Sequence, residues 1–143
     1  MAAPRDDIWA ALTDPDVLPQ LTPLLRHIET DGDLWRWQLQ RIGVLGASIT
    51  PSFTERMVFD PPHRIAYTHA PPPGRRERAA AEGWYELTEV AGGTRLRISL
   101  TFLVDLPLTR AAGPAVRRVM ERAMQHTGDR FAVNLLRHLG VPS

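Results

Sequence analysis

The stretch PAVRRVMERAMQHTGDRFAVNLLRHL, residues 114–139, is the longest helical pattern in the sequence. Apolar residues recur in it at helical spacing, and charged residues occupy the opposite side. The inward side holds Val116, Met120, Ala123, Met124, Thr127, Phe131 and Leu135. Pro114 suits a first helical turn, and Gly140 with Pro142 marks the end. We therefore predict one amphipathic helix of about 39 Å, at about 1.5 Å per residue, that covers a sheet.

The inward side of this helix is not a continuous row of leucines. It contains two methionines, a threonine and a phenylalanine, which suit either ordinary core packing or the wall of a cavity. Gly128 lies inside the pattern, although glycine in a helix interior costs about 1 kcal/mol relative to alanine. Three explanations stay open: room for a ligand, close approach of a strand, or a break in the helix.

The segments before this helix have the alternation of antiparallel strands joined by tight turns. It is clearest in 94–104, where the apolar residues Leu96, Ile98, Leu100, Phe102 and Val104 alternate with the polar residues Arg95, Arg97, Ser99 and Thr101. We predict strands at 25–30, 34–42, 49–59, 63–69, 78–90 and 94–104, and two helical pieces before them at 4–14 and 17–21. Strands followed by a helix that crosses one face predict an α+β, two-layer fold, with a single domain over residues 1–143.

The composition narrows the function. The chain has 143 residues and a net charge of +1, from 17 basic and 16 acidic residues, so no general attraction to nucleic acid follows. It lacks cysteine, and every basic residue is arginine, which excludes thiol catalysis and a Schiff-base lysine. No histidine pair has metal-ligand spacing, so we expect no metal and no other cofactor. We find no signal peptide and no apolar run near 18 residues, and we expect a cytoplasmic protein.

Two segments carry a resemblance to a known superfamily. PRDDIWAALTDP, residues 4–15, is followed by Pro23 before the first hairpin, and WYELTE, residues 84–89, is followed by GGTRL, residues 92–96. Together with the long terminal helix, these segments resemble the START-like, or helix-grip, superfamily, which includes Bet v 1 and the polyketide cyclase and dehydrase group. The resemblance implies a curved antiparallel sheet wrapped around the C-terminal helix, and a cavity for a hydrophobic ligand.

The chain departs from the pattern of that superfamily at its start. Members begin with a strand before the first helix, and here only Met1, Ala2 and Ala3 precede Pro4. The first strand is therefore missing or truncated, or the true start lies upstream. A missing strand would expose a neighbouring edge, which could pair with a second copy of the chain. We expect a homodimer in that case.

The alternation places a candidate site on the sheet face that the helix covers. We expect the ligand-binding residues to be Trp35, Trp37, Arg41, Phe53, Glu55, Met57, Tyr67, Tyr85, Ile98, Leu100, Phe102, Met120, Met124, Thr127 and Phe131. Arg41 and Glu55 could form an ion pair at the cavity mouth and orient a polar group of the ligand. Glu55 and His69, with Tyr67 or Tyr85, are the candidates for acid and base catalysis.

Two alternatives qualify these assignments. A bulge near Pro51 would reverse the register, so that Thr54 and Arg56 point inward and Glu55 points to water. His69 lies near a strand end, beside the proline-rich loop 70–76, where surface exposure is expected more than catalysis.

Three functions follow from this reading. The first is binding of a small or medium hydrophobic molecule, such as a lipid, a polyketide-like compound or an isoprenoid, without catalysis. The second is an enzyme of the cyclase or dehydratase type on the same fold. The third is an interaction module that docks on a partner through its sheet or its open edge. A fold alone does not separate them.

Overall fold

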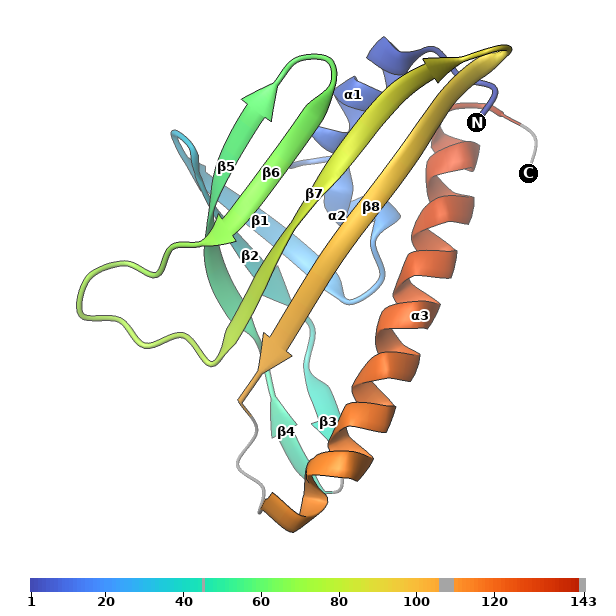
Figure 1. Ribbon diagram of the computed structural model, residues 1–143. Helices are drawn as coiled ribbons and strands as arrows, with labels where there is room; N and C mark the ends of the chain where they lie inside the picture. Colours follow the sequence, from blue (N-terminus) through green and yellow to red (C-terminus); the bar gives the residue numbers. More distant parts are fainter. Residues whose placement is uncertain (45, 106–109, 142–143) are drawn as a thin grey trace.

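The structure is a computed structural model that describes residues 1–44, 46–105 and 110–141. Its elements are, in order, α1 (Arg5–Leu12), α2 (Leu18–Leu21), β1 (Leu25–Asp31), β2 (Leu34–Leu39), β3 (Ile42–Val44), β4 (Ala47–Ile49), β5 (Ser52–Asp60), β6 (Arg64–His69), β7 (Ala79–Val90), β8 (Gly93–Val104), a 3-10 turn (Arg110–Ala112) and α3 (Gly113–His138). The predicted α+β class, with a curved antiparallel sheet and one long C-terminal helix, is confirmed. Figure 1 shows α3 running lengthwise past β8, with α1 and α2 at the end of the sheet where both termini lie.

The main sheet has six strands in the order β1-β2-β5-β6-β7-β8, and all neighbours are antiparallel. The prediction that residues 34–42 form one strand is wrong. The backbone N–H of Leu39 donates to the Pro51 carbonyl at 2.9 Å, and the chain then leaves the sheet to form the separate β3–β4 hairpin. Proline lacks an N–H and cannot extend the ladder, so β5 begins at Ser52 and not at 49 as predicted.

The larger of two hydrophobic clusters lies at the end of the sheet that α1 and α2 cover. Ile8 and Leu12 of α1, Leu18 of α2, Ile65 of β6 and Leu135 of α3 are almost completely buried there. These side chains are buried because the apolar faces of the four elements pack against one another in one core. At the other end of the sheet a smaller group packs, consisting of Phe53, Ala79 and Ala81.

No strand precedes α1 in the described part of the chain, as expected. Instead, the first residues bond to the start of β8, which is an edge of the sheet. The Met1 amino group donates to the Thr94 carbonyl at 2.7 Å, and the Thr94 N–H donates to the Met1 carbonyl at 2.9 Å. The Thr94 hydroxyl donates to the Ala3 carbonyl at 2.8 Å. These contacts extend the edge of the sheet for only a few residues.

The long helix is unbroken at Gly128, so the helix-break explanation is wrong. A Cβ built on Gly128 would have no atom within 4 Å, and close approach of a strand therefore does not explain the glycine either. Room for a ligand remains as the third explanation. Along the described residues, no helix is long and apolar enough to cross a membrane.

Candidate functional site

A cavity of about 170 Å³ lies between the inner face of the sheet and α3. Its lining consists of Thr22, Pro23, Leu24, Leu25, Trp37, Leu39, Ile42, Phe53, Glu55, Tyr67, Ala81, Tyr85, Ile98, Leu100, Phe102, Met120, Ala123, Met124, Thr127, Gly128 and Phe131. Two lining residues of β8, Ile98 and Leu100, are 47% and 45% exposed. The cavity is therefore open to solvent between β8 and α3.

Twelve of the expected binding residues line this cavity. They are Trp37, Phe53, Glu55, Tyr67, Tyr85, Ile98, Leu100, Phe102, Met120, Met124, Thr127 and Phe131. The sequence reasoning missed the segment from Thr22 to Leu24, because it lies between α2 and β1 and has no periodic pattern. Leu24 in that segment has a φ of 72°, a left-handed conformation that alternation does not predict.

Three expected residues lie outside the lining. Trp35 and Met57 share the correct face of the sheet, but they are buried in the main core, beyond the cavity. The placement of Arg41 inside is wrong: β2 ends at Leu39, and the Arg41 side chain is exposed. Within the described residues no ion pair joins Arg41 to Glu55, so the cavity lacks its expected cation.

Aromatic rings form much of the wall. Trp37 stacks on Phe53 with an interplanar angle of 10° and centroids 6.4 Å apart, and Phe53 meets Phe102 edge-on at 5.8 Å. Tyr67 and Tyr85, on neighbouring strands, have ring centroids 5.6 Å apart. Rigid rings of this kind present apolar area to a ligand at low entropic cost.

Gly83 makes room for one of these tyrosines. The Tyr67 hydroxyl donates to the Ser99 carbonyl at 3.3 Å, and this bond passes over the position where Gly83 would carry a side chain. A Cβ at Gly83 would lie 1.9 Å from the Ser99 carbonyl oxygen and 2.9 Å from the Tyr67 hydroxyl. The glycine is therefore required for the close approach of β7 and β8 below Tyr67.

Glu55 is the one carboxylic acid of the described lining, and its residue is 1% exposed. The alternative register is wrong, because Arg56 next to it is exposed and pairs with Asp33 at 2.9 Å. Oε1 of Glu55 is buried without a hydrogen-bond partner. Burial away from water, and secondarily the charge of Glu82, raise the pKa of Glu55 to about 9. At neutral pH this carboxyl group is therefore protonated and uncharged.

Two further buried polar atoms of the lining residues have no partner. These are the indole N–H of Trp37 and the hydroxyl of Thr127. A buried polar group without a partner costs about 1 to 3 kcal/mol, so native proteins rarely leave one unpaired unless another molecule binds it. Here the three residues that carry such atoms, on β2, β5 and α3, all line the same cavity.

The tyrosines of the cavity are neutral hydrogen-bonding groups. Burial, with a smaller contribution from the Glu55 charge, raises the pKa of Tyr85 to about 12. Burial also raises the pKa of Tyr67 far above its usual value. Neither phenol therefore serves as a base near neutral pH.

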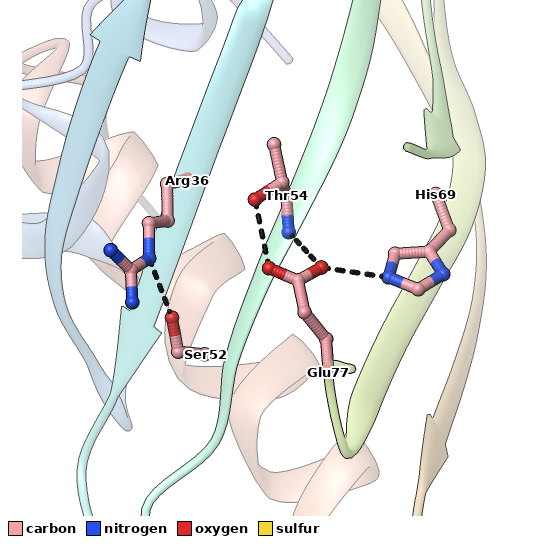
Figure 2. Close-up of polar contacts among 5 residues, drawn as sticks. All are labelled: Arg36, Ser52, Thr54, His69 and Glu77. Atoms are coloured by element: carbon pink, nitrogen blue, oxygen red, sulfur yellow. Dashed lines mark hydrogen bonds and ion pairs between the residues drawn. The ribbon is translucent and has the colours of Figure 1, made fainter. Parts of the chain in front are cut away.

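His69 does not line the cavity, although its Cα is the register partner of Glu55. Figure 2 shows its ring turned onto Glu77, whose Oε1 lies 2.9 Å from Nε2 of His69. The same carboxylate accepts hydrogen bonds from the Thr54 N–H and hydroxyl, both at 2.8 Å. Sequence reasoning missed Glu77 because it lies in the loop before β7. The Thr54 side chain is buried by this contact and not by the cavity.

The comparisons with known proteins agree with the fold. The sequence profile of a family described as polyketide cyclase / dehydrase and lipid transport matches residues 1–135. No curated protein matches the chain in sequence.

Solved structures show the same fold. A conserved protein from Geobacillus kaustophilus is 18% identical, with a TM-score of 0.66, over 96% of this chain and 89% of that one. The Zhui aromatase/cyclase from a Streptomyces species is 17% identical, with a TM-score of 0.66, over 97% and 88%. The protein Ara h 8.0201 is 17% identical, with a TM-score of 0.56, over 95% and 90%.

Proposed function

This chain belongs to the polyketide cyclase/dehydrase and lipid transport family, and from that premise we propose that it binds a small hydrophobic molecule between the sheet and α3. One observation carries the proposal. The residues that line the apolar, partly aromatic cavity include three with a buried polar atom that has no partner: Trp37, Glu55 and Thr127. Apolar walls supply affinity, and a few polar groups fix the orientation of a ligand.

The volume of the cavity indicates the part of the ligand that enters. A cavity of about 150 Å³ is known to hold one benzene ring, so about 170 Å³ suits a ring or a short branched chain. The open side at Ile98 and Leu100 allows the remainder of a longer molecule to extend along β8. A lipid, a polyketide-like compound or an isoprenoid meets both conditions. A filled core without a cavity would instead have favoured an interaction module that docks through its sheet.

Native mass spectrometry of the protein purified from its own host tests the proposal, together with melting temperatures in a panel of hydrophobic compounds. We expect a co-purified molecule, or at least one compound that raises the melting temperature through binding to the folded state. Ala123→Phe places a ring in the cavity, and it should abolish that shift. Ala115→Phe on the exposed side of the same helix is the matched control and should keep it. No co-purified ligand and no shift with any compound would contradict binding.

The structure also favours a second candidate function, an enzyme that removes water or closes a ring. The observation is a buried acid, Glu55, whose pKa of about 9 keeps a proton available beside Tyr67 and Tyr85. The wild-type protein should convert such a ligand, which the mass spectrum shows as the loss of one water. Glu55→Gln should bind the same ligand without this loss. Unchanged ligand in the wild-type protein leaves binding alone as the function.

A further inference from the structure

The described lining of the cavity carries no positively charged side chain. The described lining contains no arginine or histidine, and its acidic side chain is Glu55. Arg41, the cation expected from the sequence, is exposed and outside the lining. A negatively charged ligand group placed beside Glu55 would thus lose its hydration and gain no opposite charge, which is the costly case for any buried ion.

The groups that face Glu55 keep its proton in place. On β6 and β7 these are the phenols of Tyr67 and Tyr85, and Glu82 contributes a further negative charge. His69 lies opposite on β6, but its ring is paired with Glu77. The facing residues of α3 are uncharged. No neighbour among the described residues therefore offers a positive charge that would stabilise a Glu55 carboxylate.

A protonated carboxyl group differs from a carboxylate in what it can bind. It has one O–H donor, whereas a carboxylate only accepts. The indole N–H of Trp37 is a donor as well, and it has no acceptor in the structure. The Thr127 hydroxyl can also donate. The unpaired groups of the cavity therefore offer an excess of donors to whatever enters.

We propose that the cavity selects ligands whose inner end is an uncharged hydrogen-bond acceptor, a ketone or ester carbonyl, bound by the O–H of Glu55, and that it rejects carboxylates. This inference rests on the proposed binding function and specifies the chemistry of its ligand. Free fatty acids that enter with the carboxylate end are thereby excluded, whereas esters and polyketide-type ketones are accepted. An amine is disfavoured because its binding would create an ion pair in an apolar cavity.

Four single-ring probes of similar size test the selection: acetophenone, benzoate, benzylamine and ethylbenzene. Their dissociation constants are measured at pH 7 by NMR titration of the full chain. We expect acetophenone to bind at least tenfold more tightly than benzoate or benzylamine, and more tightly than ethylbenzene, which has no acceptor. The acetophenone affinity should stay constant below pH 8 and fall as the pH rises through about 9, because the Glu55 O–H is then lost.

Variants of Glu55 separate its role from general packing. Glu55→Gln keeps an N–H donor without a titrating proton, so it should bind acetophenone within about threefold of wild type and lose the decrease near pH 9. Glu55→Leu should lose the preference for acetophenone over ethylbenzene. Glu29→Gln, on the exposed part of β1, is the matched control and should change neither. If Glu55→Leu does not fold, the Glu55→Gln pH profile still decides.

The outcomes distinguish this inference from the binding function itself. If benzoate or benzylamine binds as tightly as acetophenone, the inference is overturned. Binding of ethylbenzene would in that case still support the cavity as a hydrophobic binding site. A pH profile unaffected by Glu55→Gln would also overturn it. Absence of binding by all four probes would count against the proposed function as well.

Discussion

The two halves of α3 meet the sheet in different ways. In the C-terminal half, Phe131 and Leu135 are buried, and the Asn134 amide donates to the Leu21 carbonyl at 3.0 Å. In the N-terminal half, Met120 and Met124 are only half-buried and line the cavity. One helix thus holds the fold together at one end and leaves space at the other. Stability and ligand binding are therefore separable by substitutions along a single element.

The largest expected effect is at the closed end. Leu135→Ala removes a side chain that is 1% exposed and leaves a cavity in the main core, so we expect a loss of about 4 kcal/mol in the free energy of unfolding. Met124→Ala, on the same face of the helix but nearer its N-terminus, should lose only about 1 kcal/mol, because its side chain already borders open space. Urea unfolding of both variants measures the contrast. Equal losses at the two positions would contradict a helix divided in this way.

The second effect concerns the acid at the open end. The folded chain holds the Glu55 proton up to a pH of about 9, whereas an ordinary carboxyl group with a pKa of 4.5 releases it in the unfolded chain. Stability that Glu55 contributes is thus fully present below pH 4.5 and is lost as the pH rises toward 9. Glu55→Gln does not titrate, so its stability relative to wild type should increase by roughly 2 to 3 kcal/mol between pH 5 and pH 7.

Urea unfolding at several pH values measures this difference, with Glu29→Gln as the control. If the difference in the free energy of unfolding between Glu55→Gln and wild type stays constant across that range, the Glu55 carboxyl group does not keep its proton in the folded chain. The two ends of the molecule would then differ in packing alone, and not also in the presence of a buried, uncharged acid.

The smallest effect is at Gly128, where the two halves of α3 join. Gly128→Ala introduces a methyl group that meets no atom within 4 Å, so the helix should gain up to about 1 kcal/mol. The same methyl group enters the cavity, and the affinity for ring-sized probes should fall. Thermal unfolding and probe titration measure the two changes. A variant that is more stable with unchanged affinity would show that the ligand does not contact this part of the helix.

The sequence predicted the layers of the fold because long alternating strands and one amphipathic helix have clear periods. It also placed Glu55 and Tyr67 on the cavity side, since a buried strand keeps its alternation from end to end. It failed at Arg41, where the strand ends two residues earlier and alternation no longer applies. Strand ends are determined by backbone hydrogen bonds, which single-residue patterns do not contain.

Other parts of the site could not be found from periodicity. Glu77 and the segment from Thr22 to Leu24 lie in loops, and their positions depend on contacts with strands that are distant in the sequence. Trp35 and Met57 share the face of the cavity residues, but their depth along the sheet places them in the core. Alternation tells which face a residue occupies and not how far along the sheet the cavity extends.

The four methionines of the chain provide the most direct test of where a ligand binds. Met120 and Met124 line the cavity, Met57 lies in the main core, and Met1 borders an adjoining hollow between β8 and the end of α3. In a protein with ¹³C-labelled methionine methyl groups, titration with acetophenone should shift the signals of Met120 and Met124 and leave Met57 and Met1 unchanged. Shifts confined to Met1, or no shift at any methionine, would contradict binding in the cavity that Met120 and Met124 line.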